Sequence, residues 1–227
     1  MILSLIVLCS MCMSIEVGHA QPSGEEILKK VEADLSDVLD YSADLDVTAD
    51  VERMNVPPMH VRMYFKQPDK FHFESEGFAM LPREGLAFNV SRVLSRFSIE
   101  EVEEETSGQG KLFRLLLRPK DERAKSTKLL VYIDPVQWKP TRIISSLFDG
   151  RTMTASFQYE KQDGHLMPSL LTVQFTASEG DGAEQDSVSE DATRMARPQM
   201  PRKGTITVRY SHYEINTGLS DDIFNKK

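Results

Sequence analysis

Histidine and cysteine are the residues whose spacing would first indicate metal or nucleophilic chemistry, and this chain has few of them. Beyond residue 20 it contains four histidines and no cysteine. No histidine pair has the HxxxH or HExxH spacing of a zinc site, and only the third lies outside a predicted strand. We therefore expect surface or edge histidines at these positions: His60, His72, His165 and His212.

The segment 54–63 holds a denser group of metal-binding side chains. It places Met54, Met59, His60 and Met63 close together in the sequence, and thioether and imidazole groups suit Cu(I). Methionine also fills irregular apolar space and contacts varied apolar ligands. Because other methionines stand at apolar positions elsewhere, we favour packing over copper and expect neither a metal nor a cofactor.

Motifs of catalysis are missing from the sequence. It has no GxSxG nucleophile elbow, no P-loop and no GxGxxG. The acids of 44–52 alternate along a predicted strand, and those of 100–105 gather at a strand end, where charge discourages aggregation between edges. The sequence therefore predicts a protein that is not an enzyme.

Residues 1–20 have the features of a secretory signal peptide. An apolar run at 2–8 is followed by the small residues Gly18 and Ala20, which predicts cleavage between Ala20 and Gln21. The run is too short to span a bilayer, which needs about 20 apolar residues. No Lys or Arg precedes it, and a start codon further upstream would explain their absence. We expect export across the inner membrane to the periplasm.

Composition limits the classes of partner. Both cysteines, Cys9 and Cys12, lie in the leader, and the bulky Leu8 and Met11 before them disfavour lipid attachment. The net charge of −8, with no basic cluster interleaved with aromatic residues, argues against nucleic acid. The length suits one globular domain, which we place at 21–227 and expect to be monomeric.

The elements that must position any site begin with a helix. Ser23 and Glu26 have the spacing of a capping box. Apolar residues then recur at helical spacing, which predicts one amphipathic helix: Ile27, Leu28, Val31, Leu35, Val38 and Leu39.

After Tyr41 the apolar period changes to two and stays so nearly to the end of the chain. Leu45 and Val47 begin the first such strand, and Asp149-Gly150 indicates a hairpin later on. Roughly ten strands at short spacing predict one large antiparallel sheet, because parallel strands would need a crossover helix between each pair. The predicted fold class is α+β, mostly β.

Three segments do not fit this pattern. Residues 78–94 are predicted to form a short helix or a loop, because Pro82 and Gly85 interrupt both periods. Residues 99–111 form an acidic strand end that runs into a glycine-rich turn. Residues 179–203 contain almost no aliphatic side chain, which predicts a disordered insertion between two strands.

The order of these segments resembles the LolA-like family of bacterial lipoprotein carriers, which also includes the RseB-type envelope sensors. The similar features are the N-terminal amphipathic helix and four stretches in a fixed order: MYFKQPDKFHFES, LLVYIDPVQWKPTRII, SLFDGRTMTASFQYEKQDGHLMPSLLTVQF and YEINTGLSDDIF. The resemblance covers most of residues 24–227. Segment 78–94 stands where the carriers usually have a short hairpin.

The resemblance implies an unclosed half-barrel, a strongly curved antiparallel sheet with helices over its concave face and an apolar cavity for acyl chains. The residues agree, since one sheet of about ten strands cannot stay flat and one amphipathic helix covers little of it. The family's lid-locking arginine would be Arg53 or Arg62. The expected cavity wall comprises Met63, Phe65, Phe71, Phe73, Phe113, Leu115, Leu117, Val131, Ile133, Met153, Phe157 and Tyr159.

We expect from this resemblance a periplasmic carrier or chaperone that binds the acyl chains of lipoproteins or lipids and takes part in outer-membrane lipoprotein sorting. Its partners would be those acyl chains together with membrane donor and acceptor proteins. Two alternatives remain: an RseB-like sensor that binds a regulatory protein, and a structural envelope protein with a filled core.

Overall fold

The computed structural model describes residues 21–75, 90–107, 110–121, 123, 126–147, 150–176 and 203–225. The predicted leader, most of segment 78–94 and nearly all of the 179–203 insertion lie outside these ranges. The described part of 78–94 belongs to a short helix, α2 (Val90–Arg96).

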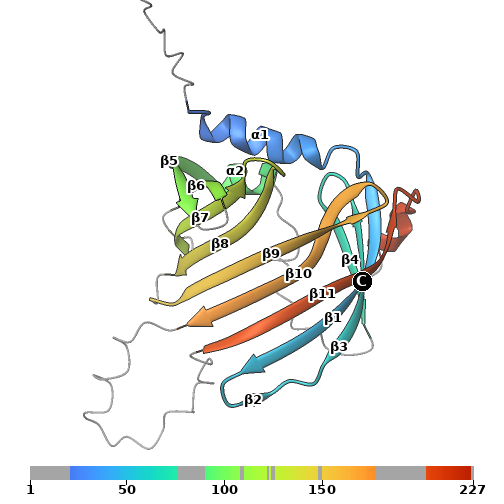
Figure 1. Cartoon of the computed structure of the whole chain (residues 1–227). Helices are drawn as coiled ribbons and strands as arrows, with labels where there is room; N and C mark the ends of the chain where they lie inside the picture. The colour runs from blue at the N-terminus through green and yellow to red at the C-terminus, as the bar shows by residue number, and fades with distance from the viewer. Residues whose placement is uncertain are drawn as a thin grey trace, which may run out of the picture.

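One open, strongly curved antiparallel sheet makes up most of the described chain (Figure 1). Its strands run in the spatial order β4-β3-β1-β11-β10-β9-β8-β7-β6-β5, and β2 pairs with β1 off this path. The predicted fold class is therefore confirmed. The strands are β1 (Asp40–Val51), β2 (Met54–Asn55), β3 (Met59–Lys66), β4 (Lys70–Ser75), β5 (Phe97–Ser107), β6 (Gly110–Pro119), β7 (Ser126–Asp134), β8 (Lys139–Leu147), β9 (Thr152–Gln162), β10 (His165–Thr176) and β11 (Lys203–Ile215).

Strand β1, from the start of the described chain, pairs with β11, from near its end. The two are the third and fourth strands counted from β4. Val47 lies opposite Val208 and Leu45 opposite Tyr210 in this pair. Strands β5 to β10, by contrast, pair with their sequence neighbours as successive hairpins. After β11 the chain ends in a short 3-10 helix, η1 (Asp221–Asn225), beside β4.

Helix α1 (Gly24–Asp34) begins at the predicted capping box. The Glu26 backbone N–H donates to Ser23 Oγ at 3.3 Å, and the Ser23 backbone N–H donates to Glu26 Oε2 at 2.8 Å. These bonds to Ser23 hold the pKa of Glu26 below its usual value. Gly24 lies so close to β5 that an added Cβ would be 2.7 Å from Ile99 Cγ2.

The helix is shorter than its apolar pattern predicts. It ends at Asp34, and Leu39, the last residue of the predicted stripe, is 60% exposed. The chain leaves the helix because polar groups from distant segments bind it there: the Gln67 side chain donates to the carbonyls of Leu35, Ser36 and Val38, and Asn216 Oδ1 accepts the Leu39 N–H at 2.7 Å.

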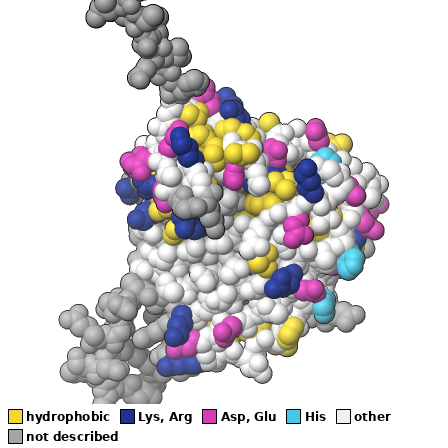
Figure 2. Space-filling model, in the orientation of Figure 1, with side chains coloured by type: hydrophobic (Ala, Val, Ile, Leu, Met, Phe, Trp, Pro, Cys, Tyr) yellow, Lys and Arg dark blue, Asp and Glu magenta, His cyan; other side chains and the backbone are white. Residues whose placement is uncertain are grey.

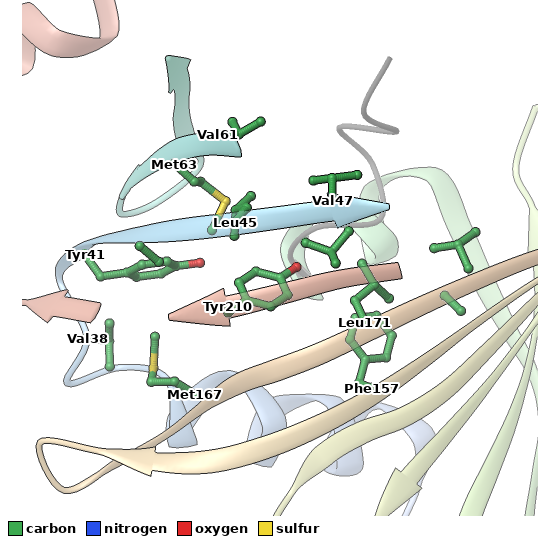
Figure 3. Packing of buried hydrophobic residues seen from close by; sticks show 14 residues of the cluster. Val38, Tyr41, Leu45, Val47, Val61, Met63, Phe157, Met167, Leu171 and Tyr210 are labelled. Atoms are coloured by element: carbon green, nitrogen blue, oxygen red, sulfur yellow. The ribbon is translucent and has the colours of Figure 1, made fainter. Parts of the chain in front are cut away.

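Buried apolar residues form two separate clusters. We call the first the helix core; its members are Ile27, Leu28, Val31, Val90, Phe113, Leu115, Leu117, Val131 and Ile133. The second, the strand core, is shown in Figure 3 and consists of Val38, Tyr41, Ala43, Leu45, Val47, Val61, Met63, Ala155, Phe157, Met167, Leu171, Val173, Val208 and Tyr210. The single curved sheet thus carries two apolar regions, and α1 packs on the helix core.

Candidate functional site

A cavity of about 240 Å³ lies where the C-terminal end of α1 meets the strand core. Six segments enclose it: the C-terminal end of α1 with the residues that follow it, the start of β1, the β3–β4 hairpin, the start of α2, the start of β8 and the β9–β10 hairpin. Its apolar lining is formed by Leu35, Val38, Tyr41, Phe65, Pro68, Phe71, Val90, Pro140, Phe157, Tyr159, Leu166, Met167 and Pro168. The polar lining residues are Glu32, Ser36, Gln67, Ser91 and Lys139.

Aromatic rings form much of the cavity wall. The rings of Phe65 and Phe71 lie 4.9 Å apart between centroids, and Tyr41 lies 5.1 Å from Phe65. On the opposite strands Phe157 and Tyr159 stack at 6.3 Å. Figure 2 shows apolar side chains gathered over α1 and immediately below it. A concave, mostly apolar site with a few polar groups is the usual form of a small-molecule site.

Four tyrosines gather at this end of the sheet. The hydroxyls of Tyr159 and Tyr213 donate to the carbonyls of Pro140 and Pro168, at 2.8 and 2.7 Å. Burial raises the pKa of Tyr41, Tyr159, Tyr210 and Tyr213, so all four phenols stay protonated at neutral pH. The two tyrosines of this group that line the cavity, Tyr41 and Tyr159, are therefore neutral phenols.

Lys139, the first residue of β8, places a buried ammonium group at the cavity wall. Its side chain is 2% exposed, and its Nζ lies 2.5 Å from Asp34 Oδ2. The same Nζ lies 5.9 Å from the ring centroid of Tyr159. Asp34 is the last residue of α1 and is 39% exposed, so the ion pair joins the end of the helix to the sheet.

Two further polar contacts hold the helix end at the cavity rim. Gln67 Nε2 donates to the carbonyls of Leu35 at 3.1 Å and Val38 at 3.0 Å, which satisfies backbone groups that a helix end leaves open. Ser91 Oγ, at the start of α2, donates to Glu32 Oε1 at 2.8 Å. Hydrogen bonds and one ion pair thus fix this end of α1.

The structure divides the twelve residues expected to line a cavity among three places. Phe65, Phe71, Phe157 and Tyr159 line the cavity described above. Met63, Phe73 and Met153 belong to the strand core or pack against it. The remaining five lie in the helix core, beneath the apolar side of α1: Phe113, Leu115, Leu117, Val131 and Ile133.

Several residues that line the cavity were not predicted to do so from the sequence. Tyr41 and Val38 flank the change from helix to strand, and Lys139 is the first residue of β8. Pro168 lies where the register of β10 against β9 shifts, so periodicity does not assign it a face. Lysine is almost never fully buried without a partner, so nothing in the local sequence marks Lys139. The alternation of β10 could have indicated Met167, since it places Met167 with Leu171 and Val173.

Arg53 and Arg62, the two residues considered for a lid lock, lie away from the cavity lining. Arg62 binds the polar face of the sheet, with Nη1 at 2.8 Å from Asp44 Oδ1 and Nη2 at 2.5 Å from Glu214 Oε2. Arg53 stands in the turn between β1 and β2 with φ 62°. Among the described residues, the basic side chain paired with the end of α1 is that of Lys139.

The histidine and the methionines of segment 54–63 point in different directions. Met63 is fully buried in the strand core, whereas His60 is exposed on the other face of β3 and pairs with Asp46. Met54 is 45% exposed. In the described ranges, no three His, Cys, Asp or Glu side chains are grouped so that they could hold a metal ion.

Two of the remaining histidines pair with carboxylates. The third, His165, lies in a strand, so the prediction that it lies outside the strands is wrong. His212 lies 3.1 Å from Asp44 and His72 lies 3.6 Å from Glu74. His165 is the first residue of β10, not outside the strands as predicted, because the β9–β10 hairpin turns at Asp163 and Gly164, which both have positive φ.

The acidic strand β5 is an end strand of the sheet, as its sequence suggested. Its carboxylates pair with bases on β6: Arg118 Nε lies 2.6 Å from Glu100, and Arg114 binds Glu103. The pairing with Arg114 holds the pKa of Glu103 below its usual value. These acids therefore lie on an exposed, charged surface and pair with the arginines of β6. Over the same described residues, no helix has the length and apolar character needed to cross a bilayer.

Comparison with known proteins yields similarity of structure without similarity of sequence. No family model matches the chain, and no curated protein sequence does. A solved structure described as an outer membrane lipoprotein-sorting protein domain, from Vibrio parahaemolyticus, is similar with a TM-score of 0.63 and 14% identity over 88% of this chain and 95% of that one.

Two further solved structures share the architecture. A DUF1329 family protein from Desulfovibrio piger matches with a TM-score of 0.57 and 11% identity, over 88% of this chain and 95% of its own. A LolA superfamily protein from Nitrosomonas europaea matches with a TM-score of 0.55 and 11% identity, over 91% of this chain and 99% of its own. The chain therefore has a LolA-like fold.

Proposed function

We propose that this protein is a periplasmic carrier or chaperone that holds acyl chains of a lipoprotein or lipid in the cavity beside the C-terminal end of α1, and that it is not an enzyme. The observation that carries the proposal is the cavity itself, lined by aromatic and aliphatic side chains inside a LolA-like half-barrel. Similarity to the lipoprotein-sorting protein domain from Vibrio parahaemolyticus supports an envelope role.

Apolar burial would supply the binding free energy. Each CH₂ group removed from water contributes about 0.8 kcal/mol, so even part of an acyl chain gives substantial affinity. Release then requires opening the cavity or transfer to a more apolar acceptor. The polar contacts at the end of α1 make that end the place where the cavity would open, and membrane donor and acceptor proteins would act there.

The cavity disfavours the alternative of a structural envelope protein with a filled core, since about 240 Å³ beside the strand core is not occupied by side chains of the described residues. The alternative of an RseB-like sensor stays a prediction. It requires a partner protein, and no observation on the described residues favours one over acyl chains.

Native mass spectrometry of the chain expressed with its leader in a bacterial periplasm, followed by solvent extraction, tests the proposal. We expect an acylated species to co-purify. Phe71→Glu, which places a charge in the cavity wall on end strand β4, should lose it. Val136→Glu, at an 85% exposed apolar position, is the matched control and should retain it.

An empty protein that also fails to bind a fluorescent fatty-acid probe would contradict the carrier function. Equal retention of the acylated species by the Phe71→Glu and Val136→Glu variants, both folded by circular dichroism, would place the lipid outside this cavity.

A further inference from the structure

We propose that the cavity binds one long-chain monocarboxylate of the fatty-acid type, and that its carboxylate replaces Asp34 as the partner of Lys139. This ligand class rests on the function proposed above, because it presupposes an acyl chain in the cavity. Two properties of the ligand are specified: the charge of its head group and the number of its chains.

The charge of the head group is indicated by Lys139. Its Nζ is buried in the cavity wall, and its only partners among the described residues are one oxygen of Asp34 and the face of the Tyr159 ring. An ammonium group carries three N–H donors and, when it is buried, needs an anionic oxygen partner. Asp34 supplies that partner in the structure, and the carboxylate of a ligand can take its place.

Asp34 is suited to give way to such a ligand. It is 39% exposed, and Lys139 is its only partner among the described residues, so its carboxylate can turn into water without leaving another group unpaired. Asp34 is also the last residue of α1, where the helix dipole disfavours a negative charge. Exchange of one carboxylate for another keeps the ammonium neutralised while it releases the helix end from the sheet.

A single chain is indicated by the size and lining of the cavity. Its volume of about 240 Å³ is below the roughly 300–1,000 Å³ usual for drug-sized ligands. It therefore accommodates part of one alkyl chain and not several chains side by side. The aromatic rings of Phe65, Phe71 and Phe157 supply the apolar wall against which such a chain would pack.

Tyr41 provides a second donor in the same lining. Its side chain is buried, and its ring lies 5.1 Å from that of Phe65, which also lines the cavity. Glu32 is the acid of the lining, but it is exposed at the rim and accepts a hydrogen bond from Ser91 Oγ. The acidic group at the rim and the basic group in the wall together favour a carboxylate placed deep in the cavity at Lys139.

Calorimetric titration of the delipidated full-length protein with palmitate and with methyl palmitate tests this assignment. The two ligands share a chain and differ in the charge of the head group. We expect palmitate to bind about tenfold or more tightly, as a charge-assisted hydrogen bond would give. Lys139→Met should bring this ratio close to one while methyl palmitate still binds. Lys161→Met, at an exposed lysine of β9, should leave the ratio unchanged.

Asp34→Asn provides a second test that does not depend on folding of the Lys139→Met variant. Removing the competing carboxylate should raise the affinity for palmitate severalfold and leave that for methyl palmitate unchanged. Equal affinities for the two ligands in the unmodified protein, or an unchanged ratio in Asp34→Asn, would overturn the carboxylate assignment and leave the carrier function standing. Failure of both ligands to bind would overturn both proposals.

Discussion

The two ends of α1 meet the sheet in different ways. The first turns bury Ile27, Leu28 and Val31 completely in the helix core, against aliphatic residues of β6 and β7. The last turn borders a cavity and is held by the Lys139–Asp34 pair, by Gln67 and by the contact between Glu32 and Ser91. The N-terminal end of the helix is held by apolar packing, and the C-terminal end is held by hydrogen bonds and an ion pair.

This difference indicates which part of the cover can move. Burial of one large aliphatic side chain contributes about 1.5–3 kcal/mol, whereas a typical hydrogen bond contributes a net 0.5–1.5 kcal/mol. The polar contacts can also be replaced by water or by a ligand, while the apolar contacts cannot. The N-terminal part of α1 therefore anchors the helix, and we expect its C-terminal end to be the part that opens above the cavity.

The largest loss of stability is expected when a buried side chain in the N-terminal part of α1 is shortened. Leu28→Ala should lower the free energy of unfolding by about 2–5 kcal/mol, because it leaves a void in a fully buried site. Leu166→Ala removes the same atoms from the wall of the existing cavity and should cost about 1 kcal/mol or less. Urea denaturation of both variants measures the contrast, and equal losses would show that the two regions are packed alike.

At the C-terminal end of α1, the two members of the Lys139–Asp34 ion pair should contribute unequally to the free energy of unfolding. Asp34→Ala leaves a buried ammonium without a carboxylate and should cost about 1–3 kcal/mol. Lys139→Met leaves Asp34 in contact with water and fills apolar space, so it should cost less than about 1 kcal/mol. Urea denaturation of both variants measures the two losses of stability, and a larger loss in Lys139→Met than in Asp34→Ala would contradict the prediction.

A smaller effect is expected at Gln67. Gln67→Ala frees the carbonyls of Leu35, Ser36 and Val38, which water can reach, and should cost about 1 kcal/mol. Amide hydrogen exchange should become faster at 32–39 and stay unchanged at 27–31. Gln158→Ala, at an exposed position of β9, is the control and should not alter exchange in α1.

The smallest effect concerns η1, which ties the chain end to the cavity half of the sheet. Lys66 and Lys70 hold the pKa of Asp221 below its usual value of about 3.8. The folded state therefore binds this proton less readily, so the pair stabilises the fold above that value and loses its contribution as the pH falls through the lowered pKa.

Comparison of Asp221→Asn with the unmodified protein checks this sign. The urea midpoint of the variant should be slightly lower at pH 7, and the difference should shrink as the pH is lowered below 4. A difference that persists or grows in acid would mean that the carboxylate contributes in its protonated form.

Much of the fold could be predicted from local patterns. The capping box of Ser23 and Glu26 set the start of α1, and strict alternation from residue 45 onward indicated antiparallel strands with one apolar face. The end of α1 could not be predicted, because it depends on Gln67 and Asn216, which the sheet brings from about 30 and about 180 residues away.

The candidate site was less accessible to prediction. Period two places Phe113 and Phe157 on the same face of the sheet, but it does not say that α1 covers the first and leaves a cavity beside the second. Lys139 gave no signal, because its burial depends on the end of a helix more than a hundred residues earlier in the chain.

The sequence by itself determined which side chains face inward, where the first helix begins and that the strands form one antiparallel sheet, because these properties depend on residues within a few positions of one another. Only the tertiary structure decided how the apolar face is divided into a filled core and a cavity, and that a lysine lies in the cavity wall. Those features depend on where α1 lies over the sheet, and its length and direction are fixed by contacts between residues far apart in the chain.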